Sequence, residues 1–117
     1  MIIKKESTFT ILKPTVDKKR NNSENILEFH KNFNEKYHNF KNDNLIIDFS
    51  ANNNMELEEI LLFSQKSKNH KKENKSFVIV CKGLDYNVLP SELMAVPTIT
   101  EAEDLIELED IERDLGI

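Results

Sequence analysis

The residues with the clearest potential for chemistry lie between positions 44 and 63, in the segment NLIIDFSANNNMELEEILLF. An apolar run ends at Asp48 and Ser50, three asparagines follow, and the chain continues as an acidic, leucine-rich segment. A serine hydroxyl at such a junction could accept a phosphate group and gain a charge of about −1.5 to −2. A carboxylate at a strand end could act as a catalytic acid or base. The same pattern also describes a strand followed by a capped helix.

The carboxylates of this segment favour the structural interpretation. Glu56, Glu58 and Glu59 would occupy the first turn of a helix, where acidic side chains stabilise the helix dipole. Ser50 would end a strand, where a serine more often caps a turn than accepts a phosphate. We therefore do not expect a catalytic carboxylate pair here.

Other reactive side chains also lack the spacing that a catalytic or metal site needs. The three histidines are His30, on or beside an apolar helix face, and His38 and His70, which we place at polar ends of helices. No pair has HExxH spacing. Cys81 would end a buried strand as a small apolar filler. With only two glycines, the chain has no phosphate-binding loop. We predict no metal, no cofactor and no enzymatic activity.

Length and composition predict one globular domain spanning residues 1–117. Hydrophobic residues make up 38% of the chain and charged residues 32%, which is too apolar for a disordered chain. No apolar run approaches the ~18 residues of a membrane helix. The start, MIIKKESTFTIL, has no signal-peptide pattern. A single cysteine agrees with a reducing compartment, so we predict a cytoplasmic protein without a membrane partner.

Charge is distributed unevenly along the chain. The net charge is −5, but residues 101–117 carry −7 and the other hundred residues therefore sum to +2. Residues 66–75 hold five lysines and one glutamate, which either end a helix favourably or attract nucleic acid. Because no aromatic residue interleaves the lysines, we expect no nucleic-acid binding. The acidic segment is either the solvated side of a helix or a docking surface for a basic partner.

The first half of the chain predicts a hairpin, a helix and a buried strand. MIIKK and TFTILK are short strands rich in β-branched residues, separated by the turn ES. Ser23 fits the N-cap of the helix. LIIDF is almost continuously apolar, which indicates a strand buried on both faces. The apolar face of the helix would comprise Ile26, Leu27, His30, Phe33 and Tyr37.

The second half predicts two further helices and two strands. Asn53 or Asn54 would cap a helix that runs into the lysine-rich segment. SFVIVCK is a buried strand, LPSEL a helical turn starting at Pro90, and VPTIT a short last strand. A final helix would begin with a capping box of Thr100 and Glu103 and end at Gly116. Its core stripe would comprise Ala102, Leu105, Ile106, Leu108, Ile111 and Leu115.

Helices that alternate with buried strands favour parallel strand pairing with right-handed crossovers. The predicted fold class is therefore α/β: a single domain with a mixed four- to five-stranded sheet. We expect an N-terminal hairpin, and helices after strands two, three, four and five.

The order of these elements, with IIDFS at the end of one strand and SFVIV in the next, resembles the STAS domain, the fold of bacterial anti-sigma-factor antagonists. The resemblance covers nearly the whole chain. Asp48-Phe49-Ser50 matches the family's strand end, which typically reads like Asp-Leu-Ser. A few residues later the antagonists carry Asp-Ser-Ser-Gly, whose serine accepts phosphate from a partner kinase. Counted without gaps, that motif falls on Glu56-Leu57-Glu58-Glu59, which keeps the acid but lacks both serines and the glycine.

This resemblance implies a non-catalytic, regulatory protein-interaction module that has lost the usual phosphorylation switch, because Glu58 carries a permanent charge. The partner would be a protein, whose identity the sequence leaves open together with the oligomeric state. The implied partner-binding residues are Asp48, Ser50, Asn53, Asn54, Glu56, Glu58 and Glu59.

The segment VPTITEAEDLIELEDIERDLG also resembles the end of a narrower group of short bacterial STAS-like proteins that are often labelled ribonuclease Z. That enzyme needs a His-x-His-x-Asp-His cluster for zinc, whereas no two histidines here are closer than eight residues. The alternative function is therefore an accessory factor associated with ribonuclease Z and tRNA 3′-end processing, without nuclease activity of its own.

Overall fold

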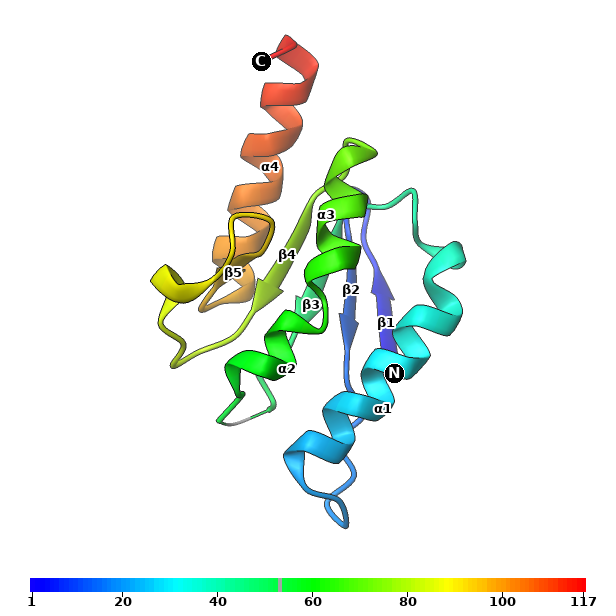
Figure 1. Ribbon diagram of the computed structural model, residues 1–117. Coiled ribbons are helices and arrows are strands. Elements are labelled where there is room, and N and C mark those ends of the chain that lie inside the picture. Colours follow the sequence, from blue (N-terminus) through cyan, green and yellow to red (C-terminus); the bar gives the residue numbers. More distant parts are fainter. Residues whose placement is uncertain (53) are drawn as a thin grey trace.

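The computed structural model describes residues 1–52 and 54–117. The elements are β1 (Ile2–Lys5), β2 (Thr10–Lys13), α1 (Asn22–Lys36), the 3₁₀ turn η1 (Tyr37–Asn39), β3 (Leu45–Asp48), α2 (Leu57–Leu61), α3 (Ser64–Lys72), β4 (Phe77–Val80), the 3₁₀ turn η2 (Tyr86–Val88), β5 (Met94–Val96) and α4 (Ile99–Leu115). Short strands are joined by helices after β2 and β3, and the chain ends in a helix after β5 (Figure 1).

The five strands form one mixed sheet in the order β1-β2-β3-β4-β5. β1 and β2 form an antiparallel hairpin, and every later neighbour pairs in parallel. In the central strand, Ile47 pairs with Leu12 on one side and Ile79 on the other. The predicted α/β class, the hairpin and the parallel pairing are confirmed.

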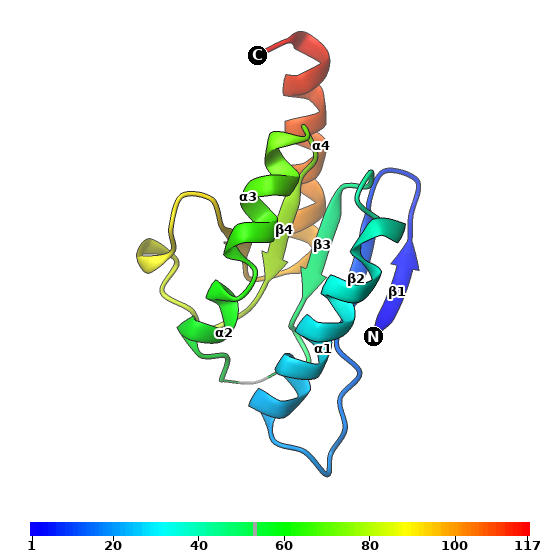
Figure 2. The same cartoon turned by 45° about the vertical axis from the view of Figure 1, so that its right-hand side comes forward.

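Helices cover both faces of the sheet. Figure 2 shows α1, α2 and α3 in front of the sheet and α4 behind it. Because side chains alternate along a strand, Leu45 and Ile47 join the core under α1–α3, whereas Ile46 packs with Ala102 and Ile106 of α4. Every residue of β3 is buried, as its apolar sequence predicts.

Phe33 lies at the centre of the larger core, beneath α1. It is fully buried, and its ring lies 5.5 Å from that of Phe63, 5.8 Å from Phe40 and 6.1 Å from Phe77, measured between centroids. These contacts connect α1 with the start of α3 and with β4. The prediction that Leu27 belongs to the apolar face of α1 is wrong, because its side chain is exposed. Phe29, which was not predicted, is buried in this face.

The predicted helix after strand four is wrong. That connection contains only η2, and Leu89, next to Pro90, has extended backbone with φ −76° and ψ 142°, as the residue before a proline prefers. Two groups of α3 also bind the segment after Pro90: Ser67 Oγ and Lys71 Nζ both donate to the Glu92 carbonyl. These tertiary contacts favour an irregular loop over a further helical turn.

The helices begin at other residues than those predicted. Asn21, not Ser23, caps α1, and its Oδ1 accepts from the Glu24 amide at 2.8 Å. Thr98, not Thr100, caps α4 and accepts from the Glu101 amide at 3.2 Å. The last strand is Met94–Val96, so the predicted strand VPTIT overlaps it only at Val96, and Ile99 and Thr100 already belong to α4. Gly116 ends α4 with a left-handed φ of 72°, as predicted.

The predicted core stripe of α4 is only partly correct. Ala102 and Ile106 are buried, but Leu108, Ile111 and Leu115 are exposed. The second half of the helix therefore turns its apolar stripe away from the sheet.

Most of the lysine-rich segment, residues 66–72, lies in helix α3, which the turn at Leu62 and Phe63 separates from α2. Within residues 1–52 and 54–117, we find no helix with the length and apolar character needed to cross a bilayer.

Candidate functional site

The predicted site begins where β3 ends. Asp48 is buried, and its Oδ1 accepts a hydrogen bond from the Ser50 backbone amide at 2.9 Å. Asp48 thereby fixes the turn, and the exposed Ser50 follows it. The Asp48 side chain lines a hollow on the α4 side of the sheet, together with Lys13 and Glu103. Its carboxylate is therefore directed away from the glutamates of α2.

Asparagines form the next part of the junction. Asn52 is buried, its Nδ2 donates to Asn22 Oδ1 at 3.1 Å, and its Oδ1 has no hydrogen-bond partner among the described residues. This bond attaches the junction to the start of α1. Asn54 is exposed and has a left-handed φ of 56°, which asparagine tolerates better than most residues. Asn53 lies outside the described residues.

The glutamates of the junction start α2. Glu56, rather than Asn54, is the N-cap, and its amide donates to Glu59 Oε1 at 2.8 Å. Glu59 Oε2 is buried without a partner in the described part of the chain. Glu56 and Glu58 are exposed. The structural role predicted for these acids at a helix start is confirmed, and two of the three carboxylates also face solvent.

A shallow hollow lies beside this junction, at the carboxyl ends of β3 and β4. Ser50, Asn52 and Asn54 line it from one side, and Lys82 and Gly83 from the other. Ligands of open α/β sheets commonly bind at the carboxyl ends of parallel strands. The structure thus brings Ser50 and Asn54 together, as the sequence predicts, and adds a cation from the end of β4.

Cys81 lies directly after β4, where the charge of Glu59 on α2 acts on its thiol. The Tyr86 hydroxyl donates to the Cys81 carbonyl at 2.7 Å, which holds η2 against the end of β4. Burial raises the pKa of the Cys81 thiol, and the negative charge of Glu59 raises it further. The thiol therefore stays protonated and is a poor nucleophile, in agreement with its predicted role as a buried filler.

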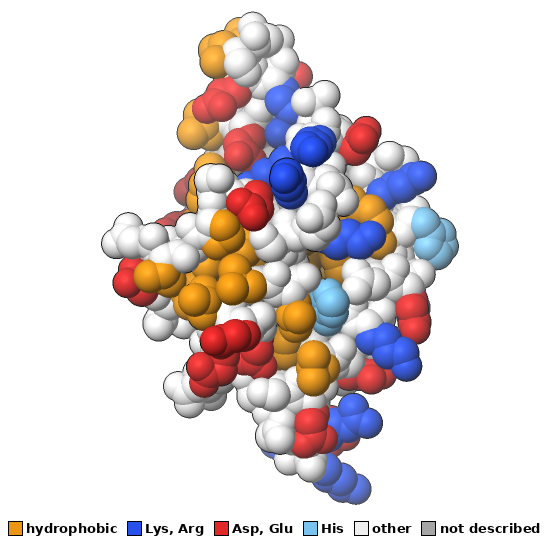
Figure 3. Space-filling model, viewed as in Figure 1, with side chains coloured by type: hydrophobic (Ala, Val, Ile, Leu, Met, Phe, Trp, Pro, Cys, Tyr) orange, Lys and Arg blue, Asp and Glu red, His pale blue; other side chains and the backbone are white. Residues whose placement is uncertain are grey.

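Exposed apolar side chains accompany the acidic start of α2. In Figure 3, hydrophobic side chains gather on the face that carries α2, directly above a cluster of acidic ones. The large exposed apolar residues of the elements in this region are Leu27 on α1, Leu61 and Leu62 at the end of α2, and Tyr86 and Val88 in η2. We call this set, together with Glu56 and Glu58, the α2 surface. Apolar anchors beside solvent-facing charges are typical of protein interfaces.

The lysines of α3 are partly engaged within the protein. Lys66 Nζ lies 4.2 Å from the centroid of the Tyr37 ring. Lys71 Nζ donates to the Glu92 carbonyl at 3.1 Å. These two lysines support packing of α3, which leaves a smaller cationic surface than the sequence indicates.

His70 lies inside the protein, so its predicted polar position is wrong. It is fully buried; its Nε2 bonds the Asp43 carbonyl at 2.7 Å and its Nδ1 bonds the Tyr37 hydroxyl. Because a carbonyl only accepts, Nε2 carries the proton and Nδ1 accepts from the hydroxyl. Burial lowers the pKa of His70, against an opposing effect of Asp43. No group of three side chains suited to a metal ion occurs in the described ranges.

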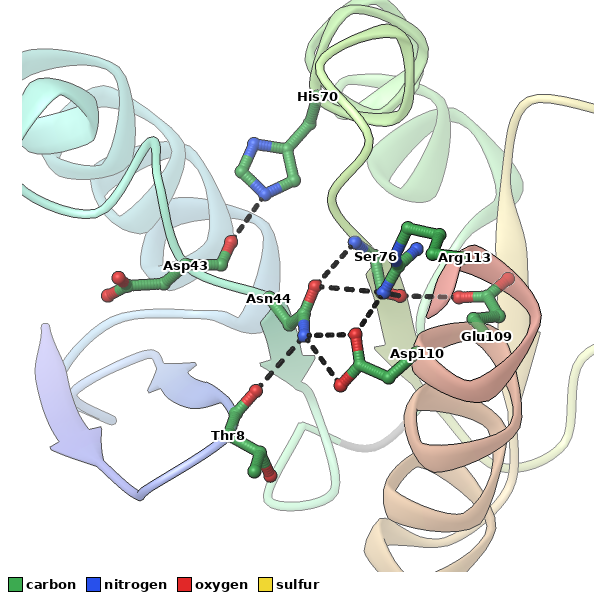
Figure 4. Close-up of polar contacts among 8 residues, drawn as sticks. All are labelled: Thr8, Asp43, Asn44, His70, Ser76, Glu109, Asp110 and Arg113. Atoms are coloured by element: carbon green, nitrogen blue, oxygen red, sulfur yellow. Dashed lines mark hydrogen bonds and ion pairs between the residues drawn. The ribbon is translucent and has the colours of Figure 1, made fainter. Parts of the chain in front are cut away.

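Asn44 joins three parts of the fold, which the sequence did not indicate. Its Oδ1 accepts from the Ser76 amide at 2.9 Å, and its Nδ2 donates to the Thr8 carbonyl at 3.0 Å and to both carboxylate oxygens of Asp110 at 3.2 Å. Figure 4 shows these bonds converging on Asn44 between the hairpin, β4 and α4. Arg113 completes the cluster by donating to Asp110 and Ser76.

Comparison with protein-family models and with curated proteins gives no match for this chain. The fold and the site define the protein as a small α/β domain with a mixed five-stranded sheet.

Proposed function

We propose that this chain is a non-catalytic protein-interaction module of STAS type, which binds a partner protein through the α2 surface and the adjoining end of β3. The observation that carries the proposal is that apolar and acidic side chains gather on the face that carries α2 (Figure 3). Among the residues of the elements there, Leu61, Val88, Glu56 and Glu58 are exposed. The strand order and the antiparallel hairpin support the STAS comparison.

The chemistry of the corner supports binding rather than catalysis. Ser50 is exposed, and the Asp48 carboxylate accepts from its backbone amide rather than from its hydroxyl. Asp48 is therefore not placed as a base for that hydroxyl. The Glu59 carboxylate accepts from the Glu56 amide as part of the helix cap. The raised pKa of Cys81 removes a nucleophile from the same region. The groups left for a partner are two carboxylates and a set of apolar anchors, which fit a protein surface that carries lysine or arginine beside an apolar patch.

An affinity pull-down from native cells with identification by mass spectrometry tests the proposal. The protein is compared with Glu58→Lys and with a matched charge reversal, Glu35→Lys, on the exposed side of α1. We expect the same partner with the native protein and Glu35→Lys, and its loss with Glu58→Lys. Reversal at Glu58 should cost less than about 1 kcal/mol of unfolding free energy, since it only removes a favourable helix-dipole contact. Capture of the same proteins by all three would refute the proposed surface.

A further inference from the structure

The outer face of α4 carries an apolar seam that the rest of the domain leaves uncovered. Leu108, Ile111 and Leu115 are spaced by three and four residues, so they share one face of the helix. Their exposed fractions are 52%, 49% and 69%. The opposite face holds Ala102 and Ile106, which are buried against Ile46 and Val80 of the sheet. Along the edge of α4, Figure 3 shows hydrophobic side chains alternating with acidic ones.

The polar cluster around Asn44 holds this seam in a fixed orientation. Asp110 accepts from Asn44, Arg113 donates to Ser76 Oγ at 3.0 Å, and Ser76 Oγ donates to Glu109 Oε1 at 2.6 Å. These bonds attach the second half of α4 to the starts of β3 and β4 (Figure 4). Because the cluster lies on the sheet side of the helix, the apolar seam at the same height faces solvent.

Acidic side chains border the seam. A hollow between the hairpin turn and α4 is lined by Ile111 of the seam, Phe9 of the turn and five carboxylates. These carboxylates belong to Glu103, Asp104, Glu107, Asp110 and Asp114. On the other side of the helix, Glu101 is exposed and Glu112 is half-buried. A partner that covers the seam must therefore bring positive charge.

This charge argues against a second copy of the chain. Residues 101–117 carry −7, so pairing two seams would place two strongly acidic helices together. Like charges that flank a helical interface oppose its formation. Anionic lipid and nucleic acid are disfavoured for the same reason.

We infer that the seam of Leu108, Ile111 and Leu115 is a docking site for an amphipathic helix of another protein, with an apolar stripe flanked by lysine or arginine. The stripe packs on the seam as in a two-helix coiled coil. The cations reach the carboxylates of the adjoining hollow. This site lies on the opposite face of the sheet from α2, so it is independent of the function proposed above.

A synthetic peptide tests this inference directly. It has about three heptads with leucine at the a and d positions and lysine at e and g; the lysines also keep it from associating with itself. A matched peptide carries glutamate in place of lysine. Binding of each fluorescein-labelled peptide to the full chain is followed by fluorescence anisotropy at low salt. The protein variants are Leu108→Ser/Ile111→Ser and a control pair of exposed apolar residues elsewhere, Val16→Ser/Met94→Ser.

We expect the lysine peptide to bind the native protein and the control pair equally. Binding to Leu108→Ser/Ile111→Ser should be weaker by at least about tenfold, and the glutamate peptide should not bind. Equal affinity for all proteins would reduce the interaction to charge attraction and overturn the inference, as would no binding of the lysine peptide at all. A dimer in sedimentation that Leu108→Ser/Ile111→Ser converts to monomer would assign the seam to a second copy and also overturn it.

Discussion

Replacing Asn44 by alanine should strongly destabilise the domain. The Ser76 residue is only 1% exposed, and leaving its amide without an acceptor costs about 1–3 kcal/mol. Loss of the bond to the Thr8 carbonyl adds about 1 kcal/mol. Water can replace the bond to Asp110, whose side chain is 38% exposed, so that contribution is small. We therefore expect a loss of about 3 kcal/mol, a large part of the ~5–15 kcal/mol typical of a domain.

Urea unfolding followed by circular dichroism measures this loss as a lower midpoint with an unchanged slope. Asn42→Ala is the matched control, because Asn42 is exposed on the preceding loop, and it should change stability by less than about 0.5 kcal/mol. Amide hydrogen exchange should also show that the second half of α4 opens more readily in Asn44→Ala. An Asn44→Ala protein within about 0.5 kcal/mol of the native protein would refute the bridging role of this side chain.

Two further predictions concern buried titratable groups. Because burial lowers the pKa of His70 below its ordinary 6.5, the unfolded chain takes up a proton that the native protein does not as the pH falls through that value. The free energy of unfolding should then decrease by at most about 1.4 kcal/mol per pH unit. His70→Gln keeps a donor and an acceptor but does not titrate, so its free energy of unfolding should decrease less. Urea titrations between neutral and mildly acidic pH measure both decreases. An equal pH dependence in both proteins would contradict this assignment. Cys81 should react far more slowly with a thiol reagent in the native protein than in urea. Glu59→Gln should lower the pKa of the Cys81 thiol, because it removes a nearby negative charge. Rapid reaction of the thiol in the native protein would contradict its burial.

The sequence predicted those parts of the fold that depend on local pattern. LIIDF and SFVIVCK contain β3 and β4 because a strand buried on both faces needs a continuous apolar run. Gly116 ends α4 because glycine adopts a left-handed backbone readily. The predicted N-caps were wrong by two residues because serine, threonine and asparagine occur at several neighbouring positions. Residue type alone therefore cannot select Asn21 over Ser23.

Contacts between distant segments were not predictable in this way. Asn44 looks like an ordinary loop residue, and its role depends on Thr8, Ser76 and Asp110, which lie far apart in the sequence. His70 had a weak signal, since Phe63, Ser67 and His70 are spaced by four and three residues, but two of these three side chains are polar. At the site, the sequence grouped Ser50 with the glutamates, whereas Lys82 reaches the same hollow only through the parallel pairing of β3 and β4.

The most direct test of the proposed function is the affinity of the captured partner for the purified protein, measured by isothermal titration calorimetry with the native chain, Glu58→Lys and Glu35→Lys. Binding through the α2 surface predicts that Glu58→Lys weakens the complex by at least about tenfold, or 1.4 kcal/mol, while Glu35→Lys binds like the native chain. If Glu58→Lys binds with native affinity, or if both reversals weaken binding equally, the partner does not bind through the α2 surface.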